Sequence, residues 1–279
     1  MRTKVSSLAA RSHPARAMRL HRLFRMGTLM VVPLDHPISD GPIAGGVNCL
    51  DTLVARLAGN GVDAVVLHKG AVRQIKPQRF RDLSLIVHLS ASTAHAPDPN
   101  AKYLVTDVPE ALRYGADAVS VHVNLGSPQE RQQLADLGAV AADCDRWNLP
   151  LMAMMYLRGP AIPDPHRPDL VAHAATIAAE LGADIVKTAY VGDVEAMRAV
   201  TASCPIPLIA AGGPRLSGDE NVRQLVRDVI HSGADGIAMG RNIFQAPDPG
   251  ALAAMVAAMV HGAESTGEAL NGYPEAVLA

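Results

Sequence analysis

Gly182-Ala-Asp-Ile-Val-Lys187 is the stretch that decides the fold: a glycine, a small residue and an aspartate lead into a short apolar run. The same phrase recurs at Gly61-Val-Asp-Ala-Val65, Gly115-Ala-Asp-Ala-Val119 and Gly233-Ala-Asp-Gly-Ile237. Glycine is common just past the end of a helix, and a short apolar run bounded by turn residues is typical of a buried strand. Four copies of one helix-to-strand turn therefore predict repeated βα units.

Eight short apolar runs are spaced along the chain around these turns. They are Leu29–Leu34, Ala64–Leu67, Leu85–Leu89, Ala118–Val123, Leu151–Met155, Asp184–Lys187, Pro207–Ala211 and Asp235–Met239. Nearly continuous apolar runs indicate parallel strands that are buried on both faces. Eight βα units favour a closed (β/α)8 TIM barrel over an open doubly wound sheet, and the length of 279 residues is near the roughly 250 typical of one barrel. No linker-like segment divides the chain, so we predict a single domain over residues 1–279.

Composition and charge exclude several other classes of protein. Apolar residues make up 49% of the chain and aromatic residues only 3%, which suits a parallel sheet covered by helices. A formal net charge of −2 predicts no nucleic-acid partner. Three cysteines without CxxC spacing argue against disulfides and a zinc ribbon and favour the cytoplasm. No apolar run approaches the roughly 18 residues of a membrane span, so we expect no membrane partner.

The ends of the chain differ from its middle. Residues 1–34 carry seven basic residues and no acidic one, a composition that organelle transit peptides share. We favour an N-terminal helical extension over residues 1–27, in which Met18, Leu20, Leu23 and Phe24 pack under the barrel, because this stretch runs directly into the first strand. The polar tail over residues 263–279 is expected to fray or to pack on a neighbouring subunit.

Three strand ends carry the residues that predict catalysis. The carboxyl ends of barrel strands open onto the active site. Lys187 closes an apolar run, and burial disfavours the ammonium form and leaves a nucleophilic amine. Tyr156, one strand earlier, can donate and accept protons, and Asp35 lies across the mouth. The alternatives are a structural ion pair of Lys187 with Asp35 and a tyrosine that merely lines the rim. Lys69, at the second strand end, is a competing candidate for the nucleophile.

Glycine pairs after the last two strands predict a phosphate site. Loops after strands 7 and 8 of such barrels commonly bind phosphate through backbone N–H groups, and an arginine can add a charge-assisted contact. The candidate substrate-binding and phosphate-binding residues are Gly212, Gly213, Gly240, Arg241, His36, Lys69 and Arg158.

No metal centre and no cofactor are predicted. His36, His68, His88 and His122 lie near strand ends but show no HxH or HExxH spacing, so a metal held by histidines from different strands is the less favoured alternative. GxGxxG is absent, and no flavin, nicotinamide or pyridoxal motif is evident. A lysine such as Lys187 that forms a Schiff base with its substrate needs no cofactor, because the Schiff base itself withdraws the electrons.

Several of these stretches together resemble a known family. They are Val32-Pro-Leu-Asp-His36, Ser39-Asp-Gly-Pro-Ile43, Leu67-His-Lys-Gly70, Ile86-Val-His-Leu-Ser90, Asp117-Ala-Val-Ser-Val-His-Val-Asn124, Pro150-Leu-Met-Ala-Met-Met-Tyr156, Asp184-Ile-Val-Lys-Thr188, Ala211-Gly-Gly-Pro214 and Gly240-Arg-Asn-Ile-Phe-Gln245. The chain resembles the archaeal-type class I aldolases of the DeoC/LacD-like family, most closely the branch typified by 2-amino-3,7-dideoxy-D-threo-hept-6-ulosonate synthase. The resemblance implies a Schiff base on Lys187, acid–base catalysis by Tyr156 and an acidic partner in Asp35.

The chain departs from the family pattern at two positions. Pro37 and Leu157 replace the family's usual glycine and proline, and the proline removes a backbone N–H. Neither change touches a proposed catalytic side chain.

The resemblance also implies substrates. The donor would be dihydroxyacetone phosphate or a deoxy-ketohexose phosphate, the acceptor L-aspartate 4-semialdehyde, and the product a seven-carbon amino-keto acid for aromatic-precursor or aminohydroxybenzoate biosynthesis. Two alternatives stay open: a fructose-bisphosphate aldolase, which needs a second phosphate site, and a non-catalytic phosphosugar-binding barrel. Family members also imply a homo-oligomer, namely a decamer.

Overall fold

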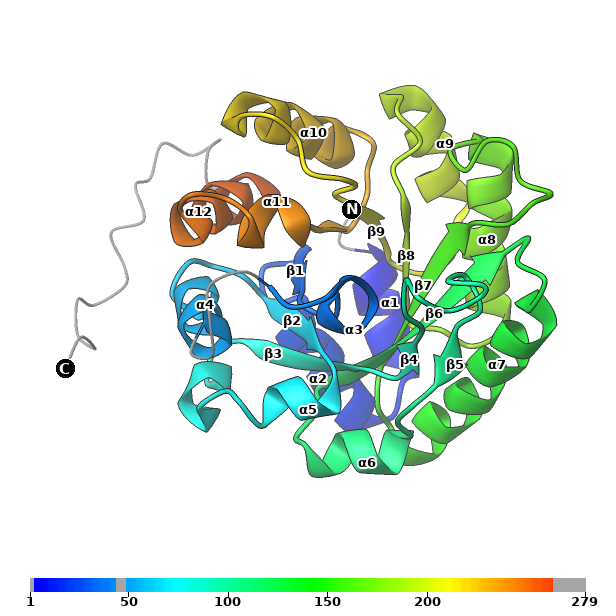
Figure 1. Cartoon of the computed structure of the whole chain (residues 1–279), viewed down its shortest axis with the longest axis horizontal. Coiled ribbons are helices and arrows are strands. Elements are labelled where there is room, and N and C mark those ends of the chain that lie inside the picture. The colour runs from blue at the N-terminus through cyan, green and yellow to red at the C-terminus, as the bar shows by residue number, and fades with distance from the viewer. Residues whose placement is uncertain (1–2, 44–48, 263–279) are drawn as a thin grey trace.

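Eight parallel strands close into a barrel in the order β1, β2, β3, β6, β7, β8, β9, β10 (Figure 1). The computed structural model describes residues 3–43 and 49–262, so the predicted tail at 263–279 lies outside the described residues. The strands are β1 (Leu29–Pro33), β2 (Ala64–Leu67), β3 (Ser84–His88), β6 (Ala118–Leu125), β7 (Leu151–Leu157), β8 (Ile185–Ala189), β9 (Leu208–Ala211) and β10 (Gly236–Ala238). Each overlaps one predicted run, and the (β/α)8-barrel prediction is confirmed.

Helices surround the strands on the outside of the barrel (Figure 1). The longer ones are α4 (Cys49–Ala58), α6 (Val108–Arg113), α7 (Glu130–Trp147), α8 (Pro168–Glu180), α9 (Val194–Ser203), α10 (Asp219–His231) and α12 (Pro249–Val260). The short elements are α3 (Pro37–Asp40), α5 (Lys69–Val72), η1 (Pro77–Phe80), α11 (Arg241–Phe244) and the two-stranded hairpin of β4 (Ser90–Ala91) and β5 (Tyr103–Leu104). No helix in the described part of the chain is long and apolar enough to span a membrane.

The repeated glycine–aspartate phrase has one structural role in all four copies. Each glycine has a φ between +76° and +91°, a backbone conformation that favours glycine. Each aspartate accepts a hydrogen bond from the backbone N–H of the preceding barrel strand. These bonds run from Met30 to Asp63 (2.7 Å), Leu85 to Asp117 (3.0 Å), Leu151 to Asp184 (2.8 Å) and Leu208 to Asp235 (3.0 Å). The phrase therefore ties the strands together in pairs at their amino ends.

The basic N-terminal segment closes this end of the barrel. It forms α1 (Thr3–Arg11) and α2 (Pro14–Leu23), which lie behind the strands in Figure 1. Three of the four buried aspartates form ion pairs with it: Lys4 with Asp235 (3.8 Å), Arg16 with Asp184 (3.2 Å) and Arg22 with Asp117 (2.9 Å). The fourth, Asp63, pairs with His261 (3.3 Å). The packing interpretation of the segment thus explains why it is basic and free of acidic residues.

The apolar face of α2 points into the barrel. Leu20, Leu23 and Phe24 are buried in a cluster with inward-facing strand residues such as Val31. Met18 is 69% exposed, so the prediction that it packs under the barrel is wrong. Since each residue turns the helix by about 100°, Met18 lies on the opposite side from Leu20.

Alternation along the strands divides the core in two. Alternate residues of each strand face the surrounding helices. The residues between them point inward and fill the lower interior of the barrel with apolar side chains. The inward set includes Leu29, Val31, Val66, Ile86, Ala118, Met152, Met154, Ile185 and Ile209. Continuing the same parity toward the carboxyl ends leads to polar residues, so the strand pleat itself directs those side chains into the mouth.

Removing Arg16 tests how the barrel base is held. The Arg16–Asp184 pair is buried, with 12% and 4% of the side chains exposed, and burial raises the pKa of Asp184 to about 6 although Arg16 opposes it. Arg16→Ala should lower the free energy of unfolding by about 3 kcal/mol at pH 8, because it leaves a buried carboxylate unpaired. Without the arginine the folded-state pKa of Asp184 rises further, so this loss should shrink as the pH falls from 8 to 5 and the carboxyl is protonated.

Urea unfolding of the wild type, Arg16→Ala and the control Arg11→Ala, whose side chain is exposed and contacts only the backbone of its own helix, would measure this. A loss that is equal at both pH values would contradict the ion-pair explanation.

Candidate active site

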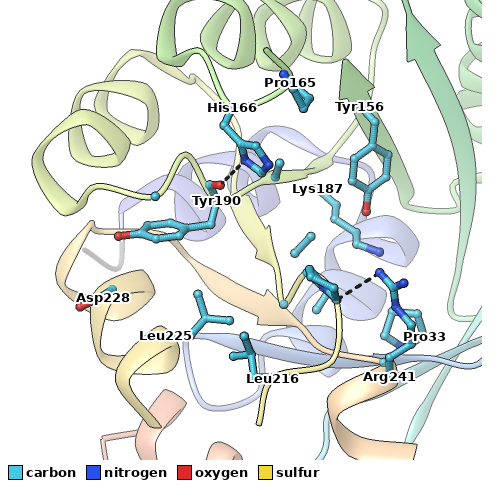
Figure 2. Close-up of a pocket in the computed structure, with 18 of the residues that line it drawn as sticks. Pro33, Tyr156, Pro165, His166, Lys187, Tyr190, Leu216, Leu225, Asp228 and Arg241 are labelled. Atoms are coloured by element: carbon cyan, nitrogen blue, oxygen red, sulfur yellow. Dashed lines mark hydrogen bonds between the residues drawn. The ribbon is translucent and has the colours of Figure 1, made fainter. Parts of the chain in front are cut away.

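Lys187 and Tyr156 meet at the mouth of the barrel. Met154 on β7 is paired in register with Lys187 on β8, and Tyr156 lies two residues further along β7 on the same inward face. The Lys187 side chain is buried, with its Nζ 3.9 Å from the Met154 sulfur and 5.8 Å from the centre of the Tyr156 ring. Figure 2 shows the tyrosine hydroxyl directed toward the lysine side chain. The amine therefore lies at the mouth of the barrel, close to the tyrosine ring.

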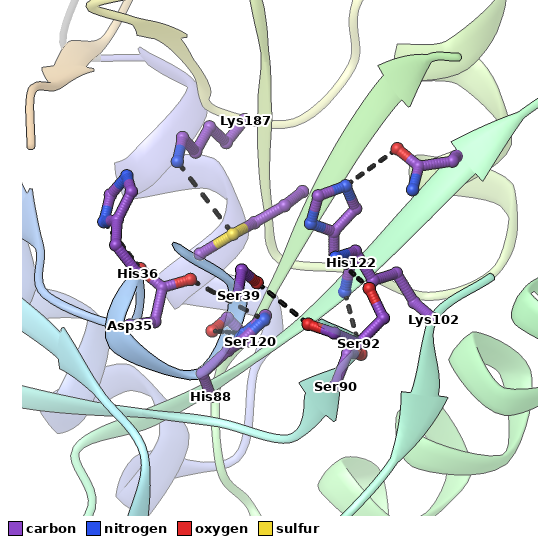
Figure 3. A network of polar contacts seen from close by, with 12 residues as sticks. Asp35, His36, Ser39, His88, Ser90, Ser92, Lys102, Ser120, His122 and Lys187 are labelled. Carbon is purple, nitrogen blue, oxygen red and sulfur yellow. Dashed lines mark hydrogen bonds and ion pairs between the residues drawn. The ribbon is translucent and has the colours of Figure 1, made fainter. Parts of the chain in front are cut away.

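Asp35 lies opposite, among histidines (Figure 3). Its carboxylate oxygens are 3.7 Å from His36 Nδ1 and 3.8 Å from His88 Nε2. Burial acts to raise the pKa of Asp35, but electrostatic interactions with His88, His36 and Lys187, in that order, outweigh burial and hold the pKa well below its usual value. Burial lowers the pKa of His88 to about 4, and His88 Nδ1 is 2.8 Å from the Ser120 hydroxyl. At neutral pH the site therefore holds a carboxylate beside neutral imidazoles.

The two glycine loops lie against each other beside Lys187. A Cβ at Gly212 would come within 2.9 Å of the Met239 side chain, and one at Gly240 within 2.9 Å of the Pro33 carbonyl oxygen. Gly213 has a φ of +67°, and its carbonyl accepts a bond from the Arg241 guanidinium (3.3 Å). Only glycine allows this close approach, which leaves backbone groups and Arg241 lining one cavity.

Asn242 joins these loops and was missed by the sequence analysis. Its amide donates to the carbonyls of Gly212 and Pro214, both at 3.0 Å, and accepts from the backbone N–H of Leu216 (2.7 Å). The side chain is buried, so these bonds are shielded from water. The asparagine after Arg241 thus positions the loop that follows β9.

Two cavities meet at Lys187. The larger one, about 710 Å³, lies on the side of the glycine loops and is lined by Gly212, Gly213, Gly240 and Arg241. The smaller one, about 300 Å³, lies on the side of Asp35 and the histidines. Both are also lined by Tyr156, Arg158, His36 and Arg241. The site can therefore hold an extended molecule with the lysine near its middle.

The other predicted substrate-binding residues behave differently from one another. His36 and Arg158 line both cavities, and the Arg158 guanidinium lies 4.6 Å from the centre of the Tyr156 ring. Lys69 lines neither cavity and forms an ion pair with Glu110 (2.9 Å), so its place contradicts the prediction. His68 lines the smaller cavity, whereas the next residue, Lys69, begins helix α5 and is directed to Glu110.

Other lining residues carried no predicted role. Lys102 and Ser92, from the loop between β4 and β5, enter the smaller cavity together with His122. Within residues 3–43 and 49–262, no group of three or more His, Cys, Asp or Glu side chains is arranged to hold a metal ion. Pro37 occupies the first turn of α3, where a missing N–H costs nothing.

The family model for DeoC/LacD family aldolases matches residues 29–246. The chain belongs to this family. It is 57% identical to a 2-amino-4,5-dihydroxy-6-oxo-7-(phosphonooxy)heptanoate synthase of Streptomyces griseus, covering 91% of this chain and 93% of that protein. It is 40% identical to a 2-amino-3,7-dideoxy-D-threo-hept-6-ulosonate synthase of Halobacterium salinarum, covering 94% of each.

Solved structures agree with this assignment. An archaeal fructose-1,6-bisphosphate aldolase, whose catalytic lysine is covalently bound to a carbinolamine intermediate, superimposes with a TM-score of 0.80 at 30% identity, covering 88% of this chain and 99% of that one. This aldolase family member is therefore an enzyme of the aldolase type, with close relatives that synthesise seven-carbon amino-keto acids.

Replacing Asn242 tests the joined loops. Asn242→Ala should cost about 2 kcal/mol of stability, because buried carbonyls lose their donors. It should also weaken the binding of inorganic phosphate about tenfold, because ordering the loop on binding then costs about 1.4 kcal/mol. Thermal unfolding and calorimetry would measure both. Asn60→Ala, whose half-buried side chain donates only to the Arg56 backbone carbonyl, serves as the control; unchanged phosphate affinity in Asn242→Ala would show that this loop is not the phosphate site.

Proposed function

We propose that this chain is a class I aldolase that joins dihydroxyacetone phosphate to L-aspartate 4-semialdehyde through a Schiff base on Lys187. The observation that carries the proposal is the buried amine of Lys187, placed beside Tyr156 where the two cavities meet. We choose the two substrates from the product names of the relatives and from the charged groups that line the two cavities.

The product name of the 57% identical relative defines an aldol disconnection. An aldol reaction leaves a hydroxyl two carbons away from the donor carbonyl. In a 4,5-dihydroxy-6-oxo-7-(phosphonooxy) chain, the new bond is therefore between carbons 4 and 5. Carbons 5 to 7 come from dihydroxyacetone phosphate, and carbons 1 to 4, with an amine on carbon 2, come from aspartate 4-semialdehyde.

The phosphate end supports this donor. Backbone N–H groups of glycine loops and an arginine are the groups that proteins use to bind phosphate. The larger cavity beside Lys187 is lined by Gly212, Gly213, Gly240 and Arg241. In our proposal, a three-carbon donor spans the distance from these groups to the lysine. The other donor considered is a deoxy-ketohexose phosphate. It is less favoured, because the relatives at about 40% identity are named for a product without a phosphate, unlike the 57% identical relative.

The lysine begins the reaction. Its amine adds to the donor carbonyl, and water leaves to give an iminium, which withdraws electrons from the neighbouring carbon. The Lys187 side chain is buried against Met154, which fixes the amine at the point where the donor carbonyl would be held. Asp35, held ionised across the mouth, stabilises the cation that forms.

Tyr156 moves the protons. In the proposal its hydroxyl assists the loss of water and the removal of a proton from the donor carbon, which yields the enamine. The enamine attacks the aldehyde carbon, the aldehyde oxygen takes up a proton, and water then releases the product from Lys187. All atoms of both substrates are retained, and the water released at the start is returned at the end.

A second candidate is fructose-bisphosphate aldolase. The archaeal aldolase structures at 30% identity favour it, and so do the cations of the smaller cavity, Lys102 and Arg158. It differs only in the acceptor, which would then carry a phosphate in place of an amino-acid end. The seven-carbon product of the first candidate fits aminohydroxybenzoate biosynthesis, whereas the six-carbon product of the second fits sugar metabolism.

Trapping with borohydride tests the lysine. Wild-type enzyme treated with dihydroxyacetone phosphate and sodium borohydride should gain a reduced three-carbon phosphate adduct on the peptide that contains Lys187, because reduction makes the Schiff base permanent. Lys187→Ala should gain none, and enzyme without donor is the control. Mass spectrometry of the digested protein locates the adduct; an adduct confined to another lysine would refute the assignment.

Tyr156→Phe tests the proton transfers. The variant removes only the hydroxyl, so its ring can still stack against Arg158 and His122. Product formation from both substrates should fall by about 10²- to 10⁴-fold, the usual contribution of a general acid–base group. Deuterium exchange into dihydroxyacetone phosphate, which reports enamine formation alone, should slow in parallel. Exchange at the wild-type rate would instead limit the tyrosine to the acceptor step.

A further inference from the structure

Lys102 reaches the smaller cavity from the loop between β4 and β5. Its Nζ donates to the Ser92 hydroxyl (2.5 Å), which in turn donates to the carbonyl of Pro99 (2.6 Å). The loop is also tied to the chain after β1, since the Ser39 hydroxyl donates to the Ser92 carbonyl and the Ala94 N–H donates to the Ser39 carbonyl, both at 3.0 Å. Figure 3 shows Lys102 beside Ser92, next to the polar residues around Asp35. The ammonium group is therefore held in place.

Among the described residues, no carboxylate forms an ion pair with this ammonium group, although Asp35, Asp40 and Asp98 act on it from farther away. Within the described residues, neither Lys102 nor Arg158 has an acidic side chain within ion-pair distance. Burial, followed by the positive charge of Arg158, lowers the pKa of Lys102. Lys4 and Lys69, by contrast, each pair with an acidic residue. Two uncompensated cations that line one cavity leave it prepared for an anion.

The anion lies at the end of the substrate farthest from the donor phosphate. Lys187 lies where the two cavities meet, and the glycine loops line the other one; Arg158 and Arg241 line both, whereas Lys102 lines only the smaller one. The smaller cavity also contains the carboxylates of Asp35 and Asp40, and Asp40 has no ion-pair partner among the described residues. Carboxylates repel a phosphate dianion but attract an ammonium group. A mixture of unpaired cations and an unpaired carboxylate fits the end of an α-amino acid.

We infer that Lys102, assisted by Arg158, binds the carboxylate of the acceptor aldehyde, with Asp40 opposite its ammonium group. This inference rests on the proposed aldol reaction at Lys187 and names the acceptor-recognising residue of the same site. Lys102 determines specificity: it selects aldehydes that end in a carboxylate and takes no part in forming the Schiff base.

Acceptor kinetics test this role. Lys102→Gln should raise KM about 10- to 100-fold for aspartate 4-semialdehyde and for 4-oxobutanoate, which keeps the carboxylate but lacks the amine, because a charge-assisted hydrogen bond is lost. For butanal, which has neither group, kcat/KM should not change. Lys102→Arg keeps the charge and should restore most of the affinity. Lys76→Gln, an exposed lysine outside both cavities, is the matched control.

An equal loss of kcat/KM with butanal would overturn the inference, since Lys102 would then only support the fold of the loop. A larger loss with glyceraldehyde 3-phosphate than with the semialdehyde would also overturn it and assign the subsite to a phosphate.

A binding measurement separates this inference from the proposed function. L-homoserine, the unreactive alcohol form of the acceptor, should bind the wild-type enzyme in calorimetry, and 3-aminopropan-1-ol, which lacks the carboxylate, should not. Lys102→Gln should lose about 10-fold or more in homoserine affinity while still gaining the borohydride adduct on Lys187. If Lys102→Gln bound homoserine as tightly as the wild type, the inference alone would be refuted. If the wild type gained no adduct on Lys187, the proposed reaction would be refuted.

Discussion

Closure of eight parallel strands into a barrel is the constraint on which the rest of this structure depends. Because side chains alternate along every strand, one of the two sets must point inward, and the space inside is shared by all eight strands. Apolar residues such as Val31 and Met154 fill its lower part, and polar residues of the same parity occupy its mouth. The apolar core inside the barrel and the candidate active site above it are thus formed by the same inward-facing set of strand side chains, at successive levels along the strands.

The two ends of the barrel use charge for opposite purposes. At the amino ends, four buried aspartates are each bonded to a neighbouring strand and each paired with a basic side chain, three of them with lysine or arginine from α1 and α2 and the fourth with His261. At the carboxyl ends, Arg241, Lys102 and Arg158 face cavities without a carboxylate partner among the described residues. Paired charges stabilise the fold, while unpaired ones remain available to bind a substrate.

Catalysis would need both ends of a long substrate to be held while its middle reacts. In the proposed reaction, the donor phosphate and the acceptor carboxylate are charged and remote from the bond that forms, so their binding would position the reacting carbons at Lys187. Strands β7 and β8 carry Tyr156 and Lys187, whereas the groups proposed to bind the two ends of the substrate lie beyond the strands, on the loops and at the start of α11. Changing a loop cation would therefore alter substrate choice without disturbing the Schiff-base chemistry.

Local patterns in the sequence determined the eight strands, the glycine–aspartate turns and the nearness of Lys187 to Tyr156, because each depends on residues close together in the chain or on the regular geometry of a barrel. Contacts between distant segments were decided by tertiary structure alone. The sequence placed Lys69 in the site, but Lys69 begins helix α5 and its side chain pairs with Glu110 instead. It said nothing of Lys102 or Asn242, since a loop's path and a buried amide's partners follow from packing between segments that no local pattern encodes.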